Sequence, residues 1–151
     1  MVSPYALCWS EENYYLIGYY EKRKDVNPFR VDRIEGIEII EDKKRVPKPK
    51  GFSLNEYTKK RFSMFSGEDL RVTLRVHNDL SNVIFDRFGN NITIYTDEED
   101  DNYFVINQPV TASSIFYGWV FQFGEKMEIV GPEDVREGFK KYINKVLNLY
   151  K

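Results

Sequence analysis

Residues 13–20 read Asn13-Tyr14-Tyr15-Leu16-Ile17-Gly18-Tyr19-Tyr20, an aromatic and aliphatic stretch that predicts a β-strand. Three further short β-prone segments surround it, at residues 4–9, 29–34 and 37–40. The polar residues 10–13 lie between the first two segments and predict a hairpin turn. Four short strands leave exposed edges unless their sheet closes on itself. We therefore expect residues 1–48 to form a small, curled β-barrel.

Residues 41–51 are basic and interrupted by prolines, and they predict a linker. After this linker, Ser53 and Glu56 fit a capping box, in which the serine hydroxyl accepts from the Glu56 amide and the glutamate reaches back. We therefore expect a helix over about 54–65, with Gly67 as its left-handed stop.

Strands and helices alternate in the rest of the chain. Hydrophobic patterning predicts four strands, at residues 71–76, 92–95, 103–106 and 127–130. We expect three helices, which begin near Asp79, Thr111 and Pro132. Gly89 and Gly124 would end the first two of them. The order β-α-β-β-α-β is that of the ferredoxin-like split fold, here with an extra terminal helix.

These patterns together predict an α+β protein with two small domains. Residues 1–48 would form the barrel, residues 68–151 the ferredoxin-like domain, and residues 49–67 the linker and connecting helix. Aromatic residues are dense, with 11 Tyr, 11 Phe and 2 Trp among 151 positions. Because each ring buries a large area, two separate small cores are feasible.

Composition narrows the setting in which the protein works. Cys8 is the only cysteine, so no intrachain disulfide can form and we expect a reducing compartment. No apolar segment approaches the roughly 20 residues that cross a bilayer, and the N-terminus lacks a secretory pattern. We therefore expect a cytoplasmic protein.

The net charge of −2 is unevenly distributed. Residues 1–66 carry 13 basic and 10 acidic residues (+3), whereas residues 67–151 carry 9 and 14 (−5). The N-terminal half is therefore the better candidate for an anionic partner.

The chain resembles the WYL domain family, which is named after a Trp-Tyr-Leu triplet. Here the triplet is Tyr14-Tyr15-Leu16, with Tyr in place of Trp. The family's downstream Arg-x-Asp-Arg-Ile is present as Arg30-Val31-Asp32-Arg33-Ile34, and Ser3-Pro4-Tyr5-Ala6-Leu7 is similar to its opening strand. Three later segments resemble the C-terminal extension that commonly follows WYL domains: residues 62–68, 118–124 and 130–132. The resemblance covers essentially the whole chain.

This resemblance implies a role in bacterial transcriptional regulation. Similar proteins carry an N-terminal winged helix-turn-helix, are usually dimeric, and have an Sm- or SH3-like barrel that binds a ligand which switches DNA binding. In some members the ligand is a piece of nucleic acid. We expect this chain to be a fragment without the helix-turn-helix, the alternative being a natural stand-alone sensor. Asn27 replaces an arginine that many members have, and Tyr20-Glu21-Lys22 lacks a frequent histidine, which points to a less charged ligand or to none.

Arg30 and Arg33 are the strongest ligand-binding candidates, because guanidinium is a planar, charged fork that fits phosphate or carboxylate. Arg30 could instead pair with Asp32 on the surface. Residues three apart in a strand also point to opposite faces, so both arginines serve one site only if the strand bends or ends between them. Tyr15 is the third candidate, expected to face solvent as a stacking platform for a base. The alternative for Tyr15 is a place in the core.

Other constellations offer no catalytic chemistry. Lys43-Lys44-Arg45 could neutralise phosphates, although basic linkers are more often simply solvated. The acidic residues 97–101 lack the glycine and glutamate that an EF-hand loop requires, so we expect a solvated turn. His77 and Cys8 lie in different predicted domains and form no nucleophile–base pair. We therefore predict no enzyme, no cofactor and no metal site.

For partners, we expect a homodimer that binds a small anionic, nucleotide or single-stranded nucleic-acid effector. Operator DNA would be reached only through an absent N-terminal domain, and no membrane is involved. The alternative is a dimerisation module without a ligand, whose interface is formed by the terminal helix and the aromatic helix 112–123.

Overall fold

A computed structural model describes residues 1–62, 64 and 68–151. The chain divides into two compact units, residues 1–66 and 67–151. No helix in the described part of the chain is both long and apolar enough to cross a membrane. The helix stop expected at Gly67 lies outside the described residues.

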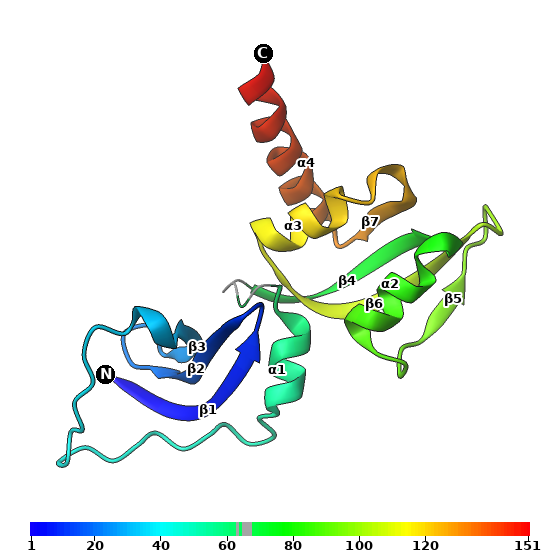
Figure 1. The fold of residues 1–151 in the computed structure, drawn as a ribbon. Helices are drawn as coiled ribbons and strands as arrows, with labels where there is room; N and C mark the ends of the chain where they lie inside the picture. Colours follow the sequence, from blue (N-terminus) through cyan, green and yellow to red (C-terminus); the bar gives the residue numbers. More distant parts are fainter. Residues whose placement is uncertain (63, 65–67) are drawn as a thin grey trace. The chain divides into compact units, whose positions relative to one another are not determined.

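The first unit is built on a three-stranded antiparallel sheet of β1 (Val2–Ser10), β2 (Asn13–Tyr20) and β3 (Asp25–Arg30) (Figure 1). The hairpin expected around residues 10–13 joins β1 to β2. The register between these strands shifts at Pro4, which lies opposite Gly18. A Cβ at Gly18 would come 2.7 Å from the Ser3 carbonyl oxygen and 2.8 Å from Val2 Cγ1. Glycine therefore lets β1 pass close over β2.

One face of this sheet forms the core of the first unit. Its buried members are Tyr5, Tyr15, Ile17, Val26 and Met64. Helix α1 (Leu54–Lys60) begins at Ser53, whose hydroxyl accepts a hydrogen bond from the Glu56 amide, as expected. The helix ends well before residue 65. Three half-buried residues, Phe52, Leu54 and Tyr57, pack against the core. The segment expected to link two domains therefore lies within the first unit.

The expected fourth strand and the closed barrel are absent from the described residues. β3 ends at Arg30 and continues into a 3₁₀ turn, Val31–Arg33, after which residues 34–40 form no strand pairing. Ile37 and Ile39 are 85% and 84% exposed. Their alternation with Glu38 gives this segment β propensity, but a strand also needs a partner edge. The three-stranded sheet therefore stays open.

The second unit contains a four-stranded antiparallel sheet in the order β5-β6-β4-β7. The strands are β4 (Glu68–His77), β5 (Ile94–Thr96), β6 (Tyr103–Ala112) and β7 (Met127–Gly131). The helices are α2 (Ser81–Phe88), α3 (Ser114–Phe121) and α4 (Glu133–Leu147). The elements thus follow one another as β-α-β-β-α-β-α along the chain (Figure 1).

Alternation along β4 creates the core of this unit, because Val72, Leu74 and Val76 share one face and are fully buried. The helices are joined by aromatic contacts. Phe88 of α2 meets Trp119 of α3 edge-on, with ring centroids 6.0 Å apart. Tyr117 of α3 packs against Phe139 and Tyr142 of α4.

Two helix starts differ from the prediction. Asp79 does not cap α2 but lies in a preceding 3₁₀ turn, Asn78–Leu80, and its carboxylate accepts from Lys126 Nζ at 2.7 Å. Thr111 is buried within β6, and the hydroxyl of Ser113 caps α3 instead. The expected helix ends agree more closely with the structure than the expected starts do. Gly89 follows α2 with φ of 84°, and Gly124 has φ of 57° shortly after α3.

Candidate functional site

Strand register brings the first two candidate residues together. Tyr15 of β2 lies directly opposite Arg30 of β3, so both side chains leave the same face of the sheet. β3 ends at Arg30, and the 3₁₀ turn Val31–Arg33 follows at once. The strand therefore ends between Arg30 and Arg33, which is the condition under which both arginines can serve one site.

All three candidates line one concavity of about 540 Å³. Apolar parts of its wall come from Pro28, Phe29 and Ile34. These three residues were missed as site residues, although they flank Arg30 and Arg33 in the sequence. Their position close to the two arginines in the sequence could have identified them as site residues. Pockets that bind small molecules combine apolar walls with a few charged groups in this way.

Arg30 is already engaged by a neighbouring carboxylate. Its Nε and Nη2 donate to the two carboxylate oxygens of Asp32 at 3.0 and 2.7 Å, a bidentate pair. Hydrogen bonding to Asp32 raises the pKa of Arg30, and the same hydrogen bond lowers the pKa of Asp32 below its ordinary value of 3.8. The surface pairing considered for Arg30 is therefore present, and its charge is largely balanced within the protein.

Arg33 is different, because it is exposed and has no ion pair or side-chain hydrogen bond with any described residue. One acidic residue, Glu11, also lines the concavity. The guanidinium of Arg33 is therefore available to an anionic ligand. Arg30 can bind an anion only if the anion displaces the Asp32 carboxylate.

The expected exposure of Tyr15 is wrong. Tyr15 is only 9% exposed and belongs to the core, whereas Tyr14 is 58% exposed. The reason is register: Tyr15 shares its face with Ile17, which the core buries completely. Tyr14 lies on the other face, where its ring meets Trp9 edge-on at 4.7 Å between centroids. Tyr15 thus contributes wall to the concavity rather than a free stacking surface.

Asn27 occupies the position at which many members of the WYL family have an arginine, and its side chain is buried. Its amide nitrogen donates to the Asp25 carbonyl at 2.9 Å, and its amide oxygen accepts from Arg23 at 3.3 Å. This residue stabilises the start of β3 and does not line the concavity.

The remaining polar clusters have structural contacts. Asp97 accepts from Arg75 at 2.7 Å and from the backbone amides of Glu99 and Asp100, which closes the acidic turn between β5 and β6. Cys8 and His77 lie in different units. Within the described ranges, no three potential metal-ligating side chains come together.

Comparison with known proteins gives two family matches. The WYL domain family matches residues 1–39, and the WCX domain family matches residues 68–147, which is 80 of the 151 residues. No curated protein sequence matches the chain.

Two solved structures are similar over 99% of this chain. One is "Proteasome accessory factor B/C (PafBC) of Arthrobacter aurescens", with 20% sequence identity and a TM-score of 0.44. The other is a CRISPR Cas-related protein, with 14% identity and a TM-score of 0.53, which indicates a shared fold. This chain spans 22% of the length of the first structure and 43% of the second. From the two family matches, in order along the sequence, the chain belongs to the family in which a WYL domain is followed by a WCX domain.

Proposed function

We propose that this chain is the effector-sensing and dimerisation region of a bacterial transcriptional regulator. A small anionic ligand, a nucleotide or a short single-stranded nucleic acid binds the concavity of the first unit. The second unit, which we assign to a ferredoxin-like fold because its strands are ordered β5-β6-β4-β7, supports the assembly. DNA recognition then belongs to a domain outside this chain, and the protein is regulatory rather than catalytic.

One observation carries this proposal: Arg33 has an exposed guanidinium that makes no side-chain hydrogen bond or ion pair with a described residue, and it lines a concavity that Arg30 and Tyr15 also line. Guanidinium binds phosphate through a planar fork of donors, and Pro28, which lies on the same face of β3 as Arg30, offers an apolar surface in the same concavity for a base or sugar. A ligand bound there changes regulation only if it favours one arrangement of the regulator over another.

Fluorescence anisotropy with a labelled short oligothymidylate tests the assignment. We expect Arg33→Ala to weaken binding at least about tenfold, as for the loss of a charged hydrogen bond. Arg71→Ala is the matched control, because Arg71 is an exposed arginine of the second unit whose guanidinium donates, among the residues that the structure describes, only to Asn107. Equal affinity of the Arg33 and Arg71 variants would refute the site.

A dimerisation module without a ligand is the second candidate, favoured by apolar exposure at the C-terminus. Leu147, Leu149 and Tyr150 are 50%, 81% and 84% exposed at the end of α4 and the turn after it. On the aromatic helix, Phe121 is half exposed whereas Phe116 and Val120 are buried. Light scattering distinguishes the candidates: a stable dimer that Leu149→Ser dissociates, together with no response to nucleotides or oligothymidylate, favours this second function.

A further inference from the structure

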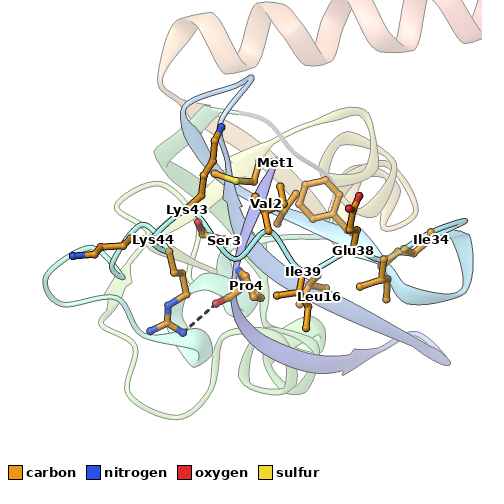
Figure 2. Close-up of a pocket in the computed structure, with 15 residues that line it drawn as sticks. Met1, Val2, Ser3, Pro4, Leu16, Ile34, Glu38, Ile39, Lys43 and Lys44 are labelled. Atoms are coloured by element: carbon orange, nitrogen blue, oxygen red, sulfur yellow. Dashed lines mark hydrogen bonds between the residues drawn. The ribbon is translucent and has the colours of Figure 1, made fainter.

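The first unit has a second concavity, of about 530 Å³ (Figure 2). Its floor includes Val2 and Pro4 of β1, Leu16 of β2 and Phe29 of β3. Leu16 lies opposite Phe29 in the strand register, so these two side chains share one face of the sheet, away from the core residue Ile17.

The roof of this concavity is an extended segment, residues 34–45, which we call the strap. The strap is attached at both ends. It starts at the 3₁₀ turn, where the Ile34 amide donates to Val31 O at 3.2 Å, and just beyond its end the Val46 amide donates to Ser3 Oγ at 3.0 Å. Residues 35–44 make one backbone hydrogen bond with the described residues, from Lys43 to Ile40, within the strap itself. The strap can therefore change its distance from the sheet without breaking a ladder.

Four of the twelve strap residues are isoleucines, at positions 34, 37, 39 and 40, and the last three of them are exposed to water. Ile37, Ile39 and Ile40 all line the concavity, yet their exposed fractions are 85%, 84% and 47%. Exposed apolar side chains that face an apolar floor are the usual mark of a binding surface. A hydrocarbon placed between floor and strap would contact both and remove these side chains from water.

The charged residues of this concavity are unevenly distributed. Lys43, Lys44 and Arg45 line one end, and in Figure 2 the labelled Lys43 and Lys44 lie on the side opposite Ile34 and Glu38. Arg45 also donates to the Pro4 carbonyl at 3.4 Å, which holds the basic end near β1. An apolar slot with cations at one end is complementary to a molecule with a hydrocarbon chain and one anionic head.

We infer that the first unit binds a single-chain amphipathic anion, such as a medium-chain fatty acid, between sheet and strap. The chain lies against Leu16, Phe29 and the strap isoleucines, and the carboxylate lies at Lys43 and Lys44. This inference goes beyond the proposed effector site, which lies around Arg33; Phe29 and Ile34 line both concavities.

Isothermal titration calorimetry of the full chain with dodecanoate, below its micelle concentration, tests the inference. Affinity should rise about threefold to fourfold for each methylene between octanoate and dodecanoate, because each added group is buried. Dodecanol and dodecylammonium should bind at least about fivefold more weakly than dodecanoate, because neither pairs with the lysines. Affinity that is independent of chain length, or equal for the three head groups, overturns the inference.

Two pairs of variants locate the site. Ile39→Ser should weaken dodecanoate binding about tenfold, whereas Ile94→Ser, the same change at an exposed isoleucine of the second unit, should not change it. Lys43→Glu/Lys44→Glu should weaken dodecanoate binding but not dodecanol binding. Lys22→Glu/Lys151→Glu, which changes two other exposed lysines, should change neither.

These positions are exposed, so the variants should fold, and thermal unfolding checks that they do. Arg33→Ala should leave dodecanoate binding intact, so that failure of the effector site and failure of this site are distinguishable. Two further results overturn the inference: no binding of dodecanoate in titrations at two well-separated temperatures, or an Ile39→Ser variant that binds dodecanoate as the natural sequence does but dissociates a dimer. The second would assign the isoleucines to another copy of the chain.

Discussion

Replacing Asp32 by asparagine should strengthen anion binding at the candidate effector site. The Asp32 carboxylate occupies the two donors of Arg30, Nε and Nη2, at 3.0 and 2.7 Å. An anionic ligand must therefore displace this carboxylate or leave Arg30 unused. The asparagine amide carries no negative charge, so Asp32→Asn makes Arg30 available and removes a repulsive charge.

The size of the effect follows from the exposure of the pair. Arg30 and Asp32 side chains are 28% and 57% exposed, so water and salt screen their attraction. We therefore expect Asp32→Asn to tighten oligothymidylate binding by about twofold to fivefold, the range of an exposed ion pair. For the same reason the midpoint of thermal unfolding should barely change.

A double-mutant cycle by anisotropy isolates the interaction. In the natural sequence, Arg30→Ala should weaken binding less than Arg33→Ala does, because Arg30 is already paired. In the Asp32→Asn background, Arg30→Ala should weaken binding more than it does in the natural sequence. Unchanged or weaker binding by Asp32→Asn would refute the reasoning, because the carboxylate would then not compete with the ligand.

The pH dependence gives a further check of the same pair. The pKa of Asp32 is lowered, so its carboxylate stays ionised throughout the neutral range. Any stability from the pair is therefore present above the ordinary pKa of 3.8 and is lost as the pH falls through the lowered pKa. Affinity differences between the natural sequence and Asp32→Asn should accordingly be constant between about pH 6 and 8.

Three further predictions concern the scaffold. Gly18→Ala should destabilise the first unit by about 1–3 kcal/mol in urea unfolding, because the new Cβ meets the β1 backbone; an unchanged midpoint would contradict this close approach. Ser53→Ala should cost about 1 kcal/mol through the lost cap of α1, whereas Ser53→Asp should retain stability. Asp97→Asn should lower the midpoint of thermal unfolding at neutral pH, because hydrogen bonding to Arg75 lowers the pKa of Asp97. The difference between the natural protein and the variant should disappear as the pH falls through that lowered pKa. A difference that stays the same at all pH values would contradict this prediction.

Local chemistry made part of the fold predictable. The period-two pattern of Val72, Leu74 and Val76 identified a strand whose one face is buried. Ser53 and Gly89 marked a helix start and a helix end, because cap and left-handed positions restrict residue type strongly. Arg30 and Arg33 were chosen for their guanidinium chemistry, but only the structure, in which the strand ends between them, brings both to one concavity.

Features that depend on residues distant in the sequence could not be predicted. The segment Ile37–Ile40 has the composition of a strand, but composition does not say whether a free edge accepts it. Tyr14 and Tyr15 are chemically identical, and only the pairing register decides which of them the core buries. Thr111 and Ser113 can both cap a helix; Thr111 is instead buried in β6, which extends to Ala112.

The salt dependence of oligothymidylate binding tests the central claim most directly. If Arg33 contacts a phosphate, the slope of log affinity against log salt concentration should become shallower by about 0.7 in Arg33→Ala, as for one lost contact on a single strand. The Arg71→Ala control should keep the slope of the natural sequence. Identical slopes for all three proteins would contradict a phosphate contact at Arg33, and with it the effector site.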